Sequence, residues 1–460
     1  MKKDSFKKYA ILFSFIIIII AVFFLHHSSN TKVPFLNDKI SEKSLSPFLF
    51  RQEVKYYDIN FNTSYNTRHN KIILTEWNKH LEDKIKVDTL EYFLFNENAE
   101  KKIQEIYNLN QHKKKSHLKF DETSNFFEFI YFAKKIEKSS VSSKYSWNYN
   151  NVDFPLVNND VINQLLLKYE TLEDQFLRNR YWFQIIKAYF YSQQKENLLS
   201  FFEKTKNSEP KNALYYRALS YCAGIYKQQN NQAKANYIYS VIYENNIDSR
   251  AEIANNFYIK DNKSFYESLL FTKNNNEKIA LWSLYGFRAD KKIAIEEIYK
   301  LNPKSPHLDY LLPKLINEEE TRLNSLVITP ILLNINTTKA NVDMDLVSLV
   351  NQISIEEKIA NPDLWKIASA YLSIFYDASI ANSKLEVLKN TGHNDEIRAL
   401  KLLCKIAKLR KQASSYKIIY PELDWLYKTK TESELYNLKD IQDYCLIHMN
   451  YINNIGQKTK

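Results

Sequence analysis

Apolar side chains recur every three to four residues along most of the chain after residue 70, and this spacing places them on one face of an α-helix. Ile73, Trp77 and Leu81 follow the spacing where the pattern begins. It predicts helices over residues 70–81, 89–108 and 126–136 and over most of the chain beyond residue 160. The fold class expected from this pattern is all-α.

Two stretches interrupt the helical pattern. Residues 139–159 are rich in serine and asparagine, so we expect a boundary between two helical blocks there. Residues 324–345 are rich in β-branched side chains and lack helical spacing, which predicts an extended excursion between two helical blocks.

Beyond residue 160, large and small side chains recur in units of two short helices. In the first unit Trp182, Ile185, Tyr189, Phe202 and Pro210 have the spacing of a tetratricopeptide (TPR) motif, a helix pair of about 34 residues. Such pairs stack because the bulky side chains of one pair fill the gaps of the next. This unit therefore predicts a helix, a turn and a second helix between residues 180 and 210.

The match to the motif is incomplete, and it recurs along the chain. Ile186, Leu198 and Thr205 occupy places where the motif has small residues. Three further units open at Tyr216, Trp282 and Trp365, of which the one at Trp282 is shorter and looser.

The arrangement resembles the TPR superfamily over residues 160–430. The chain is also similar to a group of exported bacterial TPR-like proteins of uncharacterised function, which share an Asn-x5-Glu-Trp helix start, here Asn70, Glu76 and Trp77, and a proline-containing turn before a leucine-containing helix, here residues 302–322. These resemblances imply an α-solenoid of TPR-like helix pairs and assign no chemistry.

The amino terminus carries a candidate membrane anchor. Tyr9–Leu25 is an uncharged apolar run of 17 residues, preceded by four lysines and followed closely only by Lys32. Such a helix spans about 25 Å, and the lysines place its start in the cytoplasm. The alternative is a cleaved signal peptide, but the bulky residues around His26 make a poor cleavage site. We expect an uncleaved single-pass transmembrane helix with the body periplasmic or extracellular.

These patterns divide the chain into eight expected parts. They are a cytoplasmic tail (1–8), the transmembrane helix (9–25), a stalk (26–55), an N-terminal helical region (56–138), TPR-like repeats (160–323), the extended excursion (324–345), C-terminal TPR-like helices (346–430), and a capping helix with a tail (431–460).

The amino-acid composition excludes several classes of protein function. The chain has only 4 glycines in 460 residues, so it lacks the clustered glycines of P-loops, dinucleotide-binding loops and nucleophile elbows. The three cysteines are too far apart for a CxxC motif, and we expect them to be apolar core residues. The formal net charge of +11 is spread along the chain, which argues against nucleic-acid binding.

Few residues suggest chemistry. Glu76 and His80 are four residues apart, as two metal ligands on a helix are, but a zinc site needs three or four, so we expect a surface pair and no metal site. Residues 318–320 are three consecutive glutamates, which we interpret as a solvated helix face rather than a catalytic carboxylate pair. No catalytic residue, cofactor or metal is therefore predicted.

The tyrosines are the best candidates for a binding site. Most of those between residues 181 and 243 are expected to pack between helices, and the rest to line a groove on the concave side of the stacked pairs. The groove is predicted at Tyr181, Tyr189, Tyr215, Tyr221 and Tyr226.

The sequence therefore favours a non-catalytic, membrane-anchored module that binds or scaffolds a protein or peptide partner. Two alternatives remain: a glycan-active enzyme on a helical superhelix, and a structural component of an envelope or secretion assembly.

Overall fold

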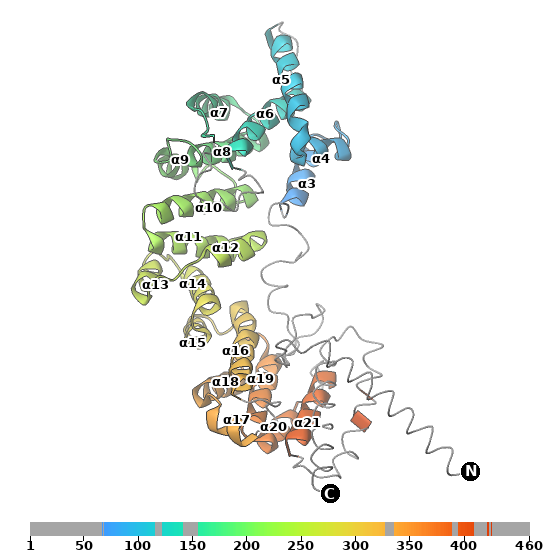
Figure 1. Cartoon of the computed structure of the whole chain (residues 1–460), viewed down its shortest axis with the longest axis vertical. Coiled ribbons are helices and arrows are strands. Elements are labelled where there is room, and N and C mark those ends of the chain that lie inside the picture. Colours follow the sequence, from blue (N-terminus) through green and yellow to red (C-terminus); the bar gives the residue numbers. More distant parts are fainter. Residues whose placement is uncertain are drawn as a thin grey trace, which may run out of the picture. The chain divides into compact units, whose positions relative to one another are not determined.

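A computed structural model describes residues 67, 69–115, 122–140, 155–326, 335–388, 394–408, 421–422 and 425. These residues form nineteen α-helices and two 3-10 helices and contain no strand, which confirms the all-α prediction (Figure 1). Within this part of the chain no helix has both the length and the hydropathy needed to cross a bilayer. The predicted anchor Tyr9–Leu25, the stalk and the predicted capping helix lie outside the described residues.

The chain divides between Asn302 and Pro303 into two compact units. The helices of the first are α3 (Asn70–His80), α4 (Val87–Phe95), η1 (Glu97–Ala99), α5 (Glu100–Lys115), α6 (Glu122–Ser140), α7 (Asn159–Thr171), α8 (Gln175–Phe190), α9 (Asn197–Thr205), α10 (Ala213–Gln228), α11 (Gln232–Asn245), η2 (Ile247–Ser249), α12 (Arg250–Asn256), α13 (Asn262–Leu269), α14 (Asn275–Arg288) and α15 (Lys291–Leu301). Those of the second are α16 (Pro306–Ser325), α17 (Ile335–Asn341), α18 (Met344–Glu356), α19 (Pro362–Ile374), α20 (Ala378–Glu386) and α21 (Asn394–Lys408).

Short polar side chains set many of the helix starts. Asn158, Asp174, Asn212 and Asp290 precede α7, α8, α10 and α15, and the side chain of each accepts a hydrogen bond from a backbone N–H in the first turn. This satisfies donors that have no partner within the helix. The asparagine-rich composition of the chain is therefore part of what divides it into short helices.

The four predicted helix pairs are all present. They are α8 with α9, α10 with α11, α14 with α15, and α19 with α20, and the two helices of each pair contact one another. Helices α8 and α10 also contact each other, as do α11 and α14. The described chain thus has a helical-repeat-like organisation.

The departure from the TPR pattern at Thr205 has a physical reason. Trp182 is fully buried, and its indole Nε1 donates a hydrogen bond of 2.7 Å to Thr205 Oγ1. A small apolar residue at this position would leave the buried indole N–H without its acceptor.

Gly224 of α10 lies close to Phe190 of α8. A Cβ at this position would lie 3.0 Å from the Phe190 ring, so glycine allows the two helices to approach each other here.

The predicted boundary at residues 139–159 does not coincide with the division between the units. Trp77 of α3 is buried against Phe126 and Phe129 of α6 and Phe176 of α8, with ring centroids 4.9, 5.2 and 4.9 Å away. Because these aromatic side chains form one core, the predicted N-terminal helical region and the repeats up to residue 302 belong to one unit.

The extended excursion predicted at residues 324–345 is wrong for residues 324–325, which end α16, and for residues 335–341 and 344–345, which are helical. Residues 335–341 form α17, and α18 begins at Met344. Thr338 and Val342 are 1% and 7% exposed, and the Val342 N–H donates to the Thr338 carbonyl at 2.8 Å. Burial of these β-branched side chains outweighs their weak preference against the helix.

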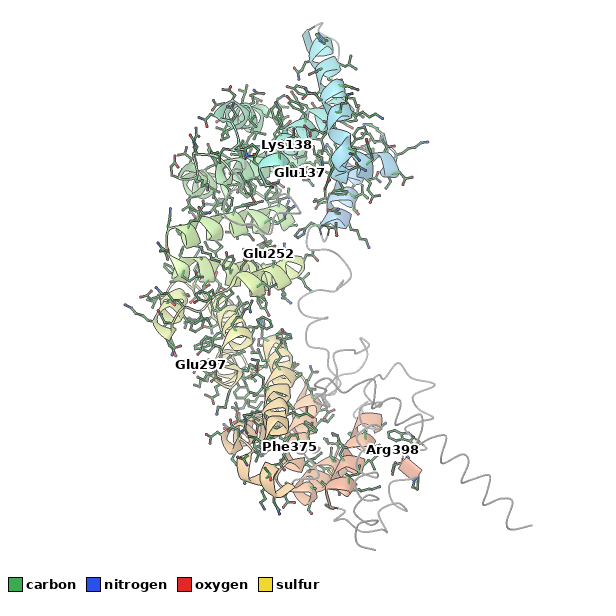
Figure 2. All side chains as sticks on the ribbon, in the orientation of Figure 1. Glu137, Lys138, Glu252, Glu297, Phe375 and Arg398 are labelled. Carbon is green, nitrogen blue, oxygen red and sulfur yellow. The ribbon has the colours of Figure 1, made fainter. Side chains whose placement is uncertain are left out.

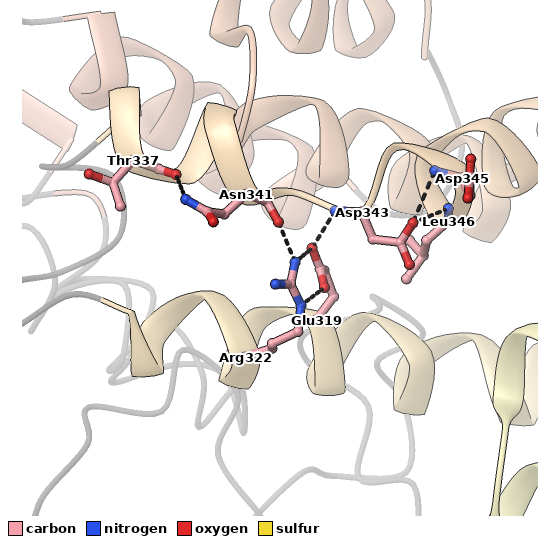
Figure 3. Close-up of polar contacts among 7 residues, drawn as sticks. All are labelled: Glu319, Arg322, Thr337, Asn341, Asp343, Asp345 and Leu346. Carbon is pink, nitrogen blue, oxygen red and sulfur yellow. Dashed lines mark hydrogen bonds and ion pairs between the residues drawn. The ribbon is translucent and has the colours of Figure 1, made fainter.

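The interpretation of residues 318–320 as a solvated face is also wrong for two of the three glutamates. Glu319 and Glu320 are 4% and 2% exposed. Arg322 donates two hydrogen bonds of 2.7 Å to Glu319, whose Oε1 also accepts the Asp343 backbone N–H at 2.8 Å (Figure 3). Glu320 accepts the Tyr371 hydroxyl at 2.8 Å. Both carboxylates connect helices of the second unit.

Candidate functional site: a cationic face of helices α6, α8 and α10

Three of the five tyrosines predicted to line a groove are core residues. Tyr181, Tyr189 and Tyr215 are 2%, 7% and 7% exposed. Their rings pack against Phe129, Phe201 and Trp182 respectively, with centroids 5.3, 5.9 and 6.1 Å apart. Burial raises the pKa of Tyr215 to about 12. These three rings stabilise the helix stack and are not accessible to a partner.

Tyr221 and Tyr226 are the two predicted groove residues that keep partial exposure. The Tyr221 ring lies 5.0 Å from that of Phe190 and 6.1 Å from that of Tyr191. Burial raises its pKa, and Arg217 opposes that change. Tyr221 is thus a half-buried aromatic residue beside a guanidinium. The expectation that most tyrosines of this region pack between helices is confirmed.

Charged side chains from three helices lie near enough to shift one another's pKa values, and we define them, together with Tyr221, as the cationic patch: Lys134, Glu137, Lys187, Arg217 and Tyr221. Lys134 and Glu137 come from α6, Lys187 from α8, and Arg217 and Tyr221 from α10. The patch contains three cations and one carboxylate. Figure 2 labels Glu137 and its exposed neighbour Lys138 on α6, and Glu252 on α12.

Lys187 is the unusual member of the patch. Its side chain is only partly exposed and has no hydrogen bond or ion pair with any residue that the structure describes. Its pKa is lowered to about 8, mainly by burial and also by repulsion from Arg217 and Lys134, while Glu137 opposes the shift. Ionised groups that lose water are normally paired, because desolvation disfavours the charge. The ammonium at this place therefore has no hydrogen-bond or ion-pair partner among the described residues, although Glu137 lies near enough to oppose the pKa shift.

The other cations of the patch are held in place by neighbours. Lys134 is 8% exposed, and its Nζ lies 2.8 Å from a Glu137 carboxylate oxygen, one helical turn along α6. The Arg217 guanidinium lies over the Phe183 ring at 4.8 Å from its centroid, a cation–π geometry. The single carboxylate of the patch is paired with Lys134, so Lys187 has no carboxylate partner among the described residues.

Sequence reasoning missed this patch, because its cations are 53 and 30 residues apart along the chain at positions 134, 187 and 217. One signal was present. Lys187 interrupts the apolar segment between Ile186 and Ala188, both of which are fully buried. A lysine at this place in a buried helix is a candidate functional residue even before its neighbours are known.

Glu76 and His80 bind different residues: Glu76 pairs with Arg180 on α8, and His80 lies beside Asp174, which precedes α8. The Arg180 guanidinium lies 2.6 Å from Glu76, and His80 Nε2 lies 3.4 Å from Asp174. The His80 ring stacks on Phe176 with centroids 4.0 Å apart, and burial lowers its pKa. In the described residues no three histidine, cysteine or acidic side chains gather as metal ligands would. The contacts of Glu76 and His80 therefore connect α3 to α8 and its N-cap.

The two described cysteines behave as the sequence predicted. Cys222 and Cys404 are reduced and only 2% and 1% exposed. Burial raises the pKa of Cys404 to about 12 and raises that of Cys222 as well. Neither thiol is ionised at neutral pH, so neither is a nucleophile. Cys445 lies outside the described residues.

In comparisons with known proteins, no protein-family model, curated protein or solved structure matches the chain.

Proposed function

We propose that this protein is a non-catalytic binding module that docks a protein partner on the cationic patch. The proposal includes a TPR-like α-solenoid, tethered by Tyr9–Leu25 with its body in the periplasm or at the cell surface. Stacked helix pairs present an extended surface to a partner, and an anchor raises the local concentration of partners near the membrane.

The observation that supports a binding role is the unpaired ammonium of Lys187. A half-buried charge without a partner lowers the stability of the free protein. Residues that lower stability concentrate at functional sites, where the cost is offset when the ligand binds. A docking partner that supplies the missing interactions would give this lysine its role.

No observation on the described residues favours the alternative of a glycan-active enzyme. Such chemistry needs two carboxylates facing each other across the substrate. Glu319 is held by Arg322, and Glu320 accepts a hydrogen bond from Tyr371. Both glutamates are buried by contacts within the second unit, so they do not offer that arrangement.

Site-directed photo-crosslinking tests the proposed function. A photoreactive amino acid replaces Lys138, which is exposed beside the patch, or Lys204, which is exposed on α9 as the control position. We expect a saturable crosslink in the native envelope from position 138 and none from position 204.

The Lys187→Met substitution should abolish that crosslink. Equal labelling from both positions, or no saturable product from position 138, would contradict docking on the patch. A product of fixed stoichiometry that survives Lys187→Met would instead support a structural part of an envelope assembly.

A further inference from the structure

The outward side of α21 carries a row of cations. Arg398 and Lys405 are exposed and Lys401 is half-exposed, whereas the leucine and isoleucine side chains of the helix are buried. The spacing of three and four residues places the three cations on one side of the helix. We define Arg398, Lys401 and Lys405 as the α21 face.

Two side chains from later in the same chain contact this face. Glu422 accepts a hydrogen bond of 2.9 Å from Arg398 Nε and one of 3.3 Å from Lys405 Nζ. The Arg398 guanidinium, labelled in Figure 2, lies over the Trp425 ring at 4.0 Å from its centroid, a cation–π geometry. One carboxylate and an aromatic ring three residues later thus bind two cations that lie two helical turns apart.

We propose that the α21 face is a docking site for a partner segment that carries a carboxylate and, three residues later, an aromatic ring. Glu422 and Trp425 occupy this site in the free protein, and the partner segment displaces them. The inference goes beyond the proposed function and does not depend on it, because α21 belongs to the second unit and the cationic patch to the first.

The ion pairs of the α21 face identify the chemistry of the occupant. Lys401 pairs with Glu386 of α20 at 3.1 Å, so it has a partner within the helical body. Among the described residues, only Glu422 pairs with Arg398 and Lys405. Displacement of Glu422 removes that carboxylate from both cations, so a segment that takes its place must supply another one.

The state of Glu422 agrees with this requirement. Although burial acts to raise the pKa of Glu422, the hydrogen bonds from Arg398 and Lys405 lower it below its usual range. The bound group is therefore an ionised carboxylate at neutral pH. Recognition of acidic segments by clustered cations is a common mode of peptide binding.

The contact is of a kind that a partner can displace. The Arg398 and Lys405 side chains stay 46% and 47% exposed with Glu422 bound. Ion pairs and cation–π contacts at exposed positions contribute little to stability. Because Glu422 belongs to the same chain, it rebinds from a high local concentration, so the free protein blocks its own docking site until a partner outcompetes it.

Fluorescence anisotropy with the full chain, purified in detergent, tests the inference. The probe is a labelled synthetic peptide of residues 418–428, which contains Glu422 and Trp425. The double substitution Glu422→Gln with Trp425→Ala vacates the face, and Glu422→Gln alone weakens the contact while keeping the ring. We expect the peptide to bind the double variant at least tenfold more tightly than the unaltered protein, with Glu422→Gln in between.

Controls separate recognition from general charge. A peptide with Gln and Ala in place of its Glu and Trp should not bind. Adding Arg398→Ala to the double variant should weaken peptide binding roughly tenfold, because Arg398 contacts both the carboxylate and the ring. Adding Lys358→Met, which removes an exposed lysine elsewhere in the second unit, should leave binding unchanged. Circular dichroism checks that each variant is folded.

The outcomes decide the inference. Equal binding to the unaltered protein and to both variants would show that Glu422 and Trp425 do not block the face, which overturns the proposal. Absence of binding to the folded Glu422→Gln and double variants would show that the contact only holds the fold together. Equal binding of the substituted peptide would overturn the proposed chemistry. Lys187→Met should not change peptide binding, so a failure of crosslinking at position 138 and a failure at α21 are separate results.

Discussion

At the scale of single residues, the informative positions are those where a polar group is buried. Trp182 and Glu319 have partners that satisfy them, through Thr205 for the indole and through Arg322 and the Asp343 backbone for the carboxylate. Lys187 has no such partner in the described chain. This difference separates residues whose polar groups hold the fold together from Lys187, whose ammonium has no protein partner among the described residues.

The first prediction concerns Lys187 and stability. Its pKa is about 8 in the folded protein and 10.5 ordinarily, so the fold disfavours the charged form. Below pH 8 Lys187 is charged in both the folded and the unfolded protein, so burying the charge lowers the free energy of unfolding by its full amount. Between pH 8 and pH 10.5 the unfolded chain binds more protons than the folded one, so the free energy of unfolding rises with pH. Lys187→Met should raise the free energy of unfolding by roughly 1–3 kcal/mol at pH 7 and flatten this rise.

Urea denaturation at pH 7 and at pH 9 measures the effect. Lys204→Met serves as the matched control, since Lys204 is an exposed lysine on α9. Its free energy of unfolding should equal that of the unaltered protein at both pH 7 and pH 9. A Lys187→Met protein that is less stable than the unaltered one at pH 7 would show that the ammonium has a partner within the chain.

At the scale of elements, polar contacts decide how consecutive helices are connected. Glu319 on α16 binds Arg322 one turn later and also accepts the backbone N–H of Asp343, which is the residue that caps α18 (Figure 3). Asp343 in turn accepts the backbone N–H groups of Asp345 and Leu346. One buried carboxylate therefore fixes the start of α18 relative to α16.

The second prediction tests this connection. Glu319→Gln removes the negative charge that holds Arg322 and weakens the acceptor for the Asp343 N–H. We therefore expect the free energy of unfolding to fall by roughly 1–3 kcal/mol. Hydrogen exchange should show faster exchange of the Asp343 amide and of the first turn of α18. Glu318→Gln, at the exposed preceding position, is the control. Unchanged protection at Asp343 would mean that helix packing alone positions α18.

The turns between helices also explain which helix pairs could be predicted from the sequence. Pairs such as α10 with α11 and α19 with α20 have short turns and apolar side chains at helical spacing, and both properties are local. Helix α17 was missed because its β-branched residues have weak helical preference, and the burial of Thr338 and Val342 cannot be read from the local sequence.

At the scale of the whole molecule, the described chain forms two units, and the first includes helices that the sequence assigned to a separate region. The core around Trp77 joins α3, α6 and α8. Arg180 of α8 adds an ion pair with Glu76 of α3, and burial lowers its pKa to about 10 despite that carboxylate. The residues before the predicted boundary thus depend on the repeats that follow it.

The third prediction follows from this shared core. Trp77→Ala should lower the free energy of unfolding by roughly 3–5 kcal/mol, because a fully buried aromatic side chain leaves a cavity. Circular dichroism and limited proteolysis should report one shifted transition for residues 70–302. Early, separate unfolding of residues 70–140 would instead restore the boundary predicted at residues 139–159. Ile72→Ala, at an exposed position of the same helix, is the control.

The fourth prediction concerns the amino terminus, where the sequence is the only guide. If Tyr9–Leu25 is an uncleaved anchor with four lysines on the cytoplasmic side, protease added to spheroplasts should digest the body, and antibodies should still detect the amino-terminal tail inside. Adding four lysines after Leu25 should reduce export, because positive charge is retained in the cytoplasm. Protection of the body from external protease would reject the proposed topology.

The sequence by itself determined the all-α class, the four helix pairs and the burial of Cys222 and Cys404, because helical spacing, capping residues and short turns are local properties. Only the tertiary structure decided where the units divide, that Tyr181, Tyr189 and Tyr215 are core residues, and that Lys134 and Arg217 lie near enough to Lys187 to lower its pKa. These outcomes depend on contacts between helices far apart in the chain. No periodicity specifies such contacts, because close approaches such as that of Gly224 to the Phe190 ring depend on how the side chains of two helices fit together.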